Sequence, residues 1–179
     1  MKVLIMFSGG VESTALIQLA LKQGHEFELL HVIHNNSSQH EMATAKIIGY
    51  PVFDLTYSKD SFDKTHVRPH RDVSLWLTGA MIAVGRDDYE QVWYGVNSTD
   101  SQKKIPLMER SWDAMMTILD NRTTIHSPLR MFSKRYQYDM LTSHQKSCIV
   151  SCRKGKYDAQ CGQCVKCMEF QKYVKSGII

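Results

Sequence analysis

The chain has 179 residues, of which 43% are hydrophobic, and its formal net charge is +4. This length and composition are typical of one compact domain with a substantial core. The sequence lacks a run of eighteen apolar residues and a cleavable leader pattern, which argues against a membrane or secreted protein. We therefore expect a single cytoplasmic domain over residues 1–179, with no membrane partner.

The charge is unevenly distributed along the chain. Residues 1–89 contain eight Lys/Arg and ten Asp/Glu, whereas residues 90–179 contain fourteen and eight, so the second half carries the positive charge. A mildly basic half suits an anionic ligand such as a nucleotide. The excess is too small to require a nucleic acid, and we expect no nucleic-acid partner.

Apolar runs and helical patterns alternate along the first half. Val3–Phe7 is a continuous apolar run, which predicts a strand buried on both faces. The apolar positions that follow predict a helix from Val11 that ends at Gly24. The next predicted elements are a strand at Glu28–Ile33, a helix at Glu41–Ile48 and a strand at Val52–Leu55.

The alternation continues after an irregular segment. Residues 56–71 lack periodicity, which favours a loop or lid over a ligand. Together the pattern predicts an α/β fold with a doubly wound, Rossmann-like parallel sheet that binds its ligand beyond the carboxyl ends of the strands. The remaining predicted elements are a helix at Ser74–Val84, a strand at Gln91–Tyr94, a helix at 107–120, a short strand around Ile125 and a helix at Lys134–Thr142.

A glycine-rich motif joins the first strand to the first helix. Residues Ser8–Ser13 read Ser-Gly-Gly-Val-Glu-Ser. The glycines allow the backbone to turn tightly, so that its amides and the helix N-terminus can point at a phosphate group, and the serines add hydroxyl donors. The spacing differs from that of a Walker loop and from that of a dinucleotide fingerprint. A plain strand-to-helix turn is the alternative interpretation.

All five cysteines lie between Cys148 and Cys167, which argues against a disulfide framework. Four of them are spaced closely enough to enclose one metal: Cys152, Cys161, Cys164 and Cys167. A structural zinc site is one interpretation, and an iron-sulfur cluster is the other. Cys148 is the spare thiol, either a buried residue or an alternative ligand.

The loop Ser8–Ser13 resembles the PP-loop of the N-type ATP pyrophosphatases, whose usual form is Ser-Gly-Gly-x-Asp-Ser. Together with the cysteine pattern, it resembles the 7-cyano-7-deazaguanine (preQ0) synthase family. This resemblance extends over nearly the whole chain, although the chain is shorter than typical members. The middle segments that carry it are Arg71–Val73, Gly95–Asp100, Ser127–Leu129 and Lys134.

The resemblance implies an adenine nucleotide α-hydrolase-like domain with a zinc-binding segment at residues 148–168. It implies an ATP-dependent ligase that converts 7-carboxy-7-deazaguanine and ammonia to preQ0, with Mg²⁺ at the phosphates, structural zinc and a homodimeric assembly. Ser8, Ser13 and Lys134 would be catalytic. The residues implied to bind ATP are Phe7, Ser8, Gly9, Gly10, Val11, Glu12, Ser13, Arg71 and Lys134.

The sequence departs from the family at Glu12, where the usual residue is Asp. The segments after the second strand and after Asp100 also differ, so the acceptor can differ even where the type of reaction does not. Two alternatives therefore stay open. One is a tRNA-thiolation adenylase of the PP-loop class, and the other is a catalytically degenerate protein that binds a nucleotide or a partner.

Overall fold

The computed structural model describes the backbone of residues 1–33, 52–56, 71–86, 88–100, 104–149, 152 and 161–175. Side chains are described for residues 1–32, 76–86, 88–100, 105–149, 152 and 161–172. The predicted helix at Glu41–Ile48 lies outside these ranges, as does nearly all of the predicted lid at 56–71. Among the described residues, no helix has the length and hydropathy needed to cross a bilayer.

Five parallel strands form one sheet in the order β3-β2-β1-β4-β5. From β1 the chain adds β2 and β3 on one side, and then returns to add β4 and β5 on the other. The doubly wound parallel sheet expected from the sequence is therefore confirmed. The strands are β1 (Lys2–Met6), β2 (Glu26–Ile33), β3 (Val52–Thr56), β4 (Gln91–Tyr94) and β5 (Thr124–His126).

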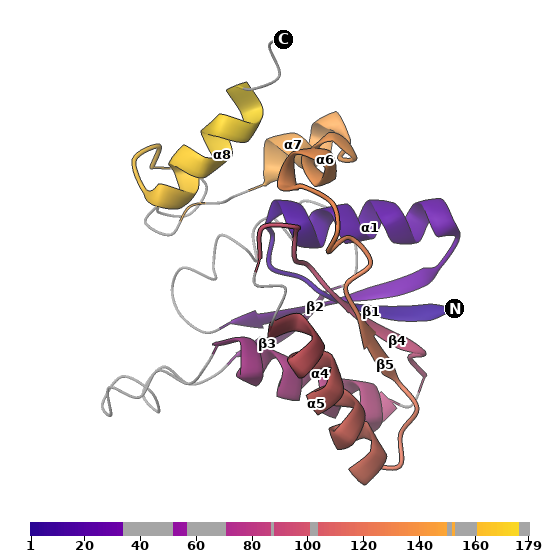
Figure 1. The fold of residues 1–179 in the computed structure, drawn as a ribbon. Helices are drawn as coiled ribbons and strands as arrows, with labels where there is room; N and C mark the ends of the chain where they lie inside the picture. Colours follow the sequence, from indigo (N-terminus) through magenta and orange to yellow (C-terminus); the bar gives the residue numbers. More distant parts are fainter. Residues whose placement is uncertain are drawn as a thin grey trace.

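Helices cover both faces of the sheet (Figure 1). α1, α6 and α7 lie on one side, α4 and α5 lie on the other, and α8 packs beside α6. The helices are α1 (Val11–Gln23), α4 (Arg71–Arg86), α5 (Lys104–Ile118), α6 (Lys134–Asp139), α7 (Ser143–Cys148) and α8 (Val165–Lys175).

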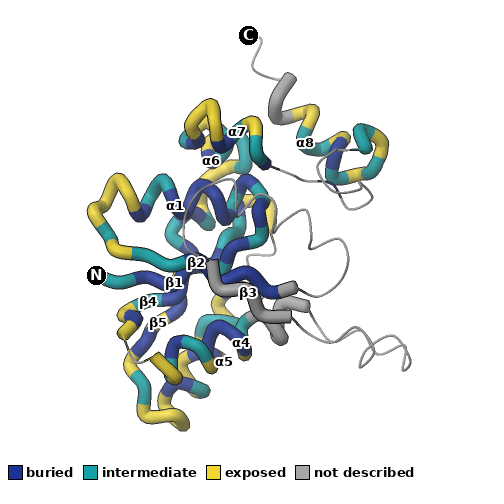
Figure 2. The backbone as a smooth tube through the Cα atoms, turned by 180° about the vertical axis from the view of Figure 1, so that it is seen from behind, coloured by how far each residue is buried: buried dark blue, intermediate teal, exposed yellow. Residues whose placement is uncertain are grey.

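Each face of the sheet has its own hydrophobic core. Alternate residues of β1 point to opposite faces, so Val3 and Ile5 pack against α1 whereas Leu4 joins the core under α4 and α5. All three are completely buried, as the continuous apolar run predicted. Figure 2 shows that the buried residues follow the strands and the helix sides that face them. The tryptophans Trp93 and Trp112 are also core residues, one on each face.

The helix predicted at Lys134–Thr142 begins at Lys134 as expected, but its predicted end is wrong, because the helix stops at Asp139 and a second short helix follows. α6 ends at Asp139, and Thr142 adopts an extended conformation that begins α7. Thr142 and Gln145 form a capping box in which each side chain accepts from the backbone N–H of the other residue. This pair satisfies amides at the start of α7 and interrupts the apolar pattern. Helix α8 has no counterpart among the predicted elements.

Candidate functional site

The glycine-rich loop lies at the carboxyl end of β1, next to β4. The order of the strands reverses between these two strands, and crevices at such a reversal are where doubly wound sheets bind ligands. Gly9 has a φ of 70°, which lets the loop turn back into α1. Gly10 is the N-cap of α1 and provides no side-chain cap, so the first-turn amides of the helix can face an anion.

Ser13 closes the loop from within the first turn of α1. The Ser8 N–H donates to Ser13 Oγ over 3.2 Å, and the Ser13 hydroxyl donates to the Gly10 carbonyl over 3.3 Å. The hydroxyl oxygens of Ser8 and Ser13 lie 3.2 Å apart. Ser13 is buried, whereas Ser8 is half-buried. Ser13 thus shapes the loop, and the Ser8 hydroxyl is the more accessible of the two.

Gly95 allows β4 to approach this loop. A Cβ atom at Gly95 would lie only 2.8 Å from the Ser13 nitrogen and 2.9 Å from two atoms of Glu12. Real Cβ atoms do not approach a backbone so closely, so any side chain here would push β4 away from the start of α1. Glycine at position 95 is therefore needed for the two halves of the sheet to meet at the loop.

Glu12 joins the loop to two later segments of the chain. Its Oε1 lies 2.9 Å from Lys134 Nζ and accepts a hydrogen bond of 3.1 Å from Asn97 Nδ2. The Glu12 and Lys134 side chains are only 19% and 13% exposed, so water screens the ion pair weakly. The carboxylate that departs from the family motif is thus the group that gathers Asn97 and Lys134 at the loop.

The turn after β4 fixes the orientation of the Asn97 amide. Asn97 Oδ1 accepts from the Thr99 N–H over 2.9 Å and from the Thr99 hydroxyl over 2.6 Å. The Asn97 N–H donates to Asp100 Oδ2 over 2.7 Å. Since Oδ1 is the acceptor in these contacts, Nδ2 is left to point at Glu12. Asp100 therefore acts here as a turn residue.

Two further contacts support the loop from either side. Lys134 is the first residue of α6, and the N-cap Ser133 accepts from the Tyr136 N–H over 3.1 Å. His31, which is buried in β2, places Nδ1 2.9 Å from the Phe7 carbonyl oxygen. Because a carbonyl only accepts, Nδ1 carries the proton in this contact. His31 is thus a packing residue at the end of β1.

The structure brings together six of the predicted nucleotide-site residues. The side chains of Phe7 and Val11 instead lie in the core, so only their backbone groups can face a ligand. Arg71 is the first residue of α4, and its side chain is outside the described side chains. The six residues that meet at the loop are Ser8, Gly9, Gly10, Glu12, Ser13 and Lys134.

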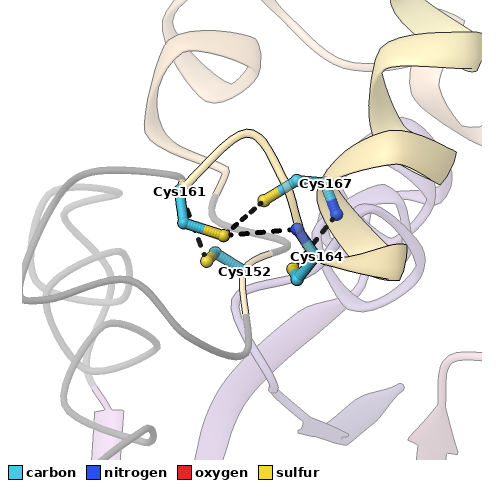
Figure 3. Close-up of side chains that lie close together, drawn as sticks. All are labelled: Cys152, Cys161, Cys164 and Cys167. Atoms are coloured by element: carbon cyan, nitrogen blue, oxygen red, sulfur yellow. Dashed lines mark hydrogen bonds between the residues drawn. The ribbon is translucent and has the colours of Figure 1, made fainter.

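Four cysteines converge at the beginning of α8 (Figure 3). All four sulfur atoms lie within 4.8 Å of one another, and those of Cys161 and Cys167 are 3.9 Å apart. Cys152 and Cys167 are buried, and the other two are half-buried. Such a set of thiols can hold a metal ion, as the spacing predicted. The four are Cys152, Cys161, Cys164 and Cys167.

The backbone around the thiols favours negative charge on sulfur. The Cys161 N–H donates to Cys152 Sγ, the Cys164 N–H to Cys161 Sγ, and the Cys167 N–H to Cys164 Sγ, all over 3.4–3.5 Å. Gly162 has a φ of 70° within this turn. Burial raises the pKa of the Cys167 thiol to about 12, so a cation that binds there must displace its proton.

Cys148 lies outside this cluster. Its Sγ is 3.8 Å from His144 Nε2, one turn earlier on α7, and 3.8 Å from the Ser147 hydroxyl.

The helix that follows the cluster is anchored on α6, where the rings of Phe170 and Tyr138 meet edge to face at 5.8 Å. The Tyr138–Phe170 contact therefore joins α8, which begins at the cysteine cluster, to the helix that carries Lys134.

No protein-family model matches the chain, and no curated protein sequence matches it. Solved structures are similar in fold, among them the following two. One is a predicted subunit of a tRNA methyltransferase from Methanocaldococcus jannaschii, with a TM-score of 0.50 and 21% identity over 78% of this chain and 75% of that one. The other is a 4-thiouridine synthetase in complex with RNA and ATP, with a TM-score of 0.51 and 12% identity over 97% of this chain. The chain spans about half the length of that synthetase (50%), and at these identities the likeness concerns the fold alone.

Proposed function

We propose that the protein is an ATP-dependent enzyme of the PP-loop class that activates a carboxylate by adenylation. The observation that carries this proposal is the convergence of the Ser8–Ser13 loop, Asn97 and Lys134 on the Glu12 carboxylate, at the reversal point of the sheet. A glycine-rich loop at a helix N-terminus receives phosphate groups, and a lysine beside it neutralises their charge. The fold of the ATP-bound 4-thiouridine synthetase is consistent with this assignment.

Charge stabilisation is what such a site contributes to the reaction. The amides of the loop and the Lys134 ammonium would stabilise the charge that develops on the phosphates as the α-phosphorus is attacked. Mg²⁺ would add to this neutralisation. Carboxylate oxygens are ligands that Mg²⁺ prefers, and Glu12 is the carboxylate that the structure places in the loop, so Glu12 is the residue that would hold it.

The substrate we propose is 7-carboxy-7-deazaguanine, on the resemblance to the preQ0 synthase family. Its carboxylate attacks ATP and releases pyrophosphate, and ammonia then displaces AMP and loses a proton to give the amide. A second ATP adenylates the amide oxygen with release of pyrophosphate. Loss of AMP and a proton from this intermediate yields the nitrile. No residue needs to act as a covalent nucleophile, in keeping with a site built from amides, hydroxyls and a lysine.

The test is a product analysis of the purified chain. It is incubated with ATP, Mg²⁺, ammonium and 7-carboxy-7-deazaguanine, and AMP, the amide and the nitrile are measured by mass spectrometry. Formation of AMP and nitrile in a ratio of two to one is the expected result. AMP without nitrile would point to another acid as the substrate. Binding of ATP without turnover would instead favour a degenerate nucleotide-binding protein.

One observation favours tRNA thiolation as a second candidate. Phe132 and Tyr136 flank Lys134 along the chain, are 40% and 50% exposed, and stack at 4.6 Å with an interplanar angle of 17°. Exposed aromatic rings are how proteins hold unpaired RNA bases. In this case the protein would bind unmodified tRNA and consume ATP only with tRNA present, and a Phe132→Ala, Tyr136→Ala double variant would weaken RNA binding by about tenfold.

For the cysteine cluster we propose structural zinc. A tetrahedral ion with Zn–S bonds of about 2.3 Å holds its sulfurs about 3.8 Å apart, close to the 3.9 Å between Cys161 and Cys167. Four thiolates would also fill the coordination shell, which leaves no position for catalysis.

Metal analysis of the purified protein should find one zinc per chain and no visible colour. Cys167→Ser should lose the zinc and lower the melting temperature, whereas Cys148→Ser should keep both, because Cys148 lies outside the cluster. A brown protein that contains iron would contradict the assignment and favour a thiolation enzyme.

A further inference from the structure

Gln137 is a polar side chain that is shielded from solvent. It lies on α6 and is completely buried. A buried amide costs free energy unless its donors find acceptors, so its contacts explain what it does there. Nothing in the sequence around Gln137 distinguishes it from a surface glutamine.

The Gln137 amide nitrogen meets three backbone carbonyls at once. Nε2 donates to the Val96 and Leu129 oxygens over 3.0 Å each and to the Phe132 oxygen over 3.2 Å. Val96 belongs to the turn after β4, whereas Leu129 and Phe132 belong to the loop after β5. The Phe132 oxygen also accepts from the Ser98 N–H over 3.0 Å. One nitrogen atom therefore connects two loops and a helix that are far apart in sequence.

These three segments carry the groups that meet at Glu12. Asn97 directly follows Val96. Lys134 lies one helical turn before Gln137, so Lys134 and Gln137 project from the same side of α6. Asn97 Nδ2 and Lys134 Nζ both contact Glu12 Oε1. The distance between the Asn97 amide and the Lys134 ammonium thus depends on how the loops after β4 and β5 are held together.

We propose that Gln137 is a positioning residue that sets the relative placement of Asn97 and Lys134 at the phosphate loop. Its effect on activity rests on the proposed function. Its hydrogen bonds go to the loops after β4 and β5 and not to Glu12 or to the loop Ser8–Ser13, so we infer that it acts through the two loops. Without its two N–H groups, the Val96 and Leu129 carbonyls lose their buried donor and the loops can move apart. A displacement of about 1 Å at a reacting centre can lower a rate about a hundredfold.

The chain offers a matched control in Gln145. Gln145 is also a buried glutamine in a short helix, but its side chain accepts from the Thr142 N–H and caps α7. Gln137→Met and Gln145→Met remove the same groups, so both variants should lower the melting temperature. If Gln137 positions the site, only Gln137→Met should lower kcat for pyrophosphate release, by ten- to a hundredfold. Equal rates for the two variants would overturn the proposal.

A double-mutant cycle tests the positioning without any activity. Gln137→Met and Lys134→Met are combined, and the unfolding midpoints in urea of the single and double variants are compared. Non-additive shifts are expected, because Gln137→Met already loosens the ion pair that Lys134→Met removes. Additive shifts would contradict the proposal. The control pair Gln145→Met and Lys134→Met should shift the urea midpoint additively.

The outcome of this cycle is separate from that of the proposed function. If the wild type binds no ATP, the proposed function fails, but the cycle still decides the role of Gln137. Gln137→Asn, which keeps the amide on a shorter side chain, serves as the milder variant if Gln137→Met does not fold.

Discussion

Two clusters of charged side chains lie at opposite ends of the same parallel strands. At the carboxyl end, Glu12 pairs with Lys134 beside the glycine-rich loop. At the amino end, Glu28 pairs with Lys2 and Arg86 over 3.0 and 3.1 Å. An ion pair by itself does not mark a site, since the two ends differ in what surrounds the pair.

The amino-end cluster is closed on itself. Tyr89 donates a hydrogen bond to Glu28, Lys2 also pairs with Asp88, and the Lys2 ammonium lies 4.9 Å from the centre of the Tyr89 ring. Burial raises the pKa of the Tyr89 hydroxyl, and the adjacent Glu28 carboxylate raises it further. Here the charges satisfy one another and hold β1, β2 and the start of β4 together.

The carboxyl-end pair differs because it borders backbone groups that can bind an anion. The first turn of α1 has no side-chain cap, and Gly95 packs directly against the loop because it has no Cβ. A phosphate could replace the Glu12 carboxylate as the partner of Lys134. We therefore expect changes at this end to affect activity and changes at the other end to affect stability.

The largest effect should come from the two lysines. Lys134→Met should lower the rate of pyrophosphate release by about a hundred- to a thousandfold, the usual cost of losing one group that stabilises transition-state charge. Lys2→Met, which breaks the Glu28 pair at the other end, should lower the urea midpoint and leave the rate per folded molecule unchanged. Steady-state kinetics and urea titration of both variants decide the matter. Loss of activity in both variants, or in neither, would show that the two ends do not differ in function.

A pair of glycine variants gives the next effect. Gly95→Ala should destabilise the fold by about 2 kcal/mol through overpacking, and should weaken ATP binding because β4 is pushed from the loop. Gly85, in α4, would place its Cβ in open space, so Gly85→Ala should raise stability by up to about 1 kcal/mol. Urea unfolding and isothermal titration with ATP measure the two effects. Normal ATP affinity in Gly95→Ala would refute the close-approach argument.

The smallest effect concerns acid stability at the amino end. Burial by itself raises the pKa of the Glu28 carboxyl, but hydrogen bonds from Tyr89 and Lys2 and the nearby cations outweigh it and hold the pKa below its ordinary value. The folded state thus releases this proton more readily than the unfolded state. The stabilisation is complete above the ordinary pKa of 4.5 and is lost as the pH falls through the lower folded value.

Glu28→Gln should remove this acid dependence, which we expect to amount to about 1 kcal/mol or less. Urea midpoints measured from pH 6 down to about pH 3 for the wild type and the variant give the difference. Glu26→Gln, at an exposed position of the same strand, serves as the control. A wild-type curve that is parallel to that of Glu28→Gln would show that the Glu28 network does not contribute.

Local patterns were sufficient to predict the sheet and the glycine-rich turn between β1 and α1. Val3–Phe7 is apolar throughout because β1 is buried on both faces, and Ser8–Ser13 carries its own turn chemistry. The cysteine cluster was also predictable, since Cys161, Cys164 and Cys167 are spaced three residues apart, which brings their thiols close together. In each case the residues that cooperate are neighbours in sequence.

The rest depended on tertiary contacts that no local pattern records. Asn97 and Gln137 acquire their roles from partners 85 and 41 residues away, and Gly95 is required by the backbone of Glu12 and Ser13. The break between α6 and α7 was the exception, because Thr142 and Gln145 have the spacing of a capping box.

The Glu12–Lys134 contact also affects how the protein exists before it meets a ligand. A largely buried ammonium without an anion would weaken the fold. Glu12 acts as a resting counter-ion, so the chain can fold in the absence of nucleotide. An incoming triphosphate must then compete with the Glu12 carboxylate for Lys134. Anions that interact with the Lys134 ammonium more weakly than Glu12 does will not displace this carboxylate.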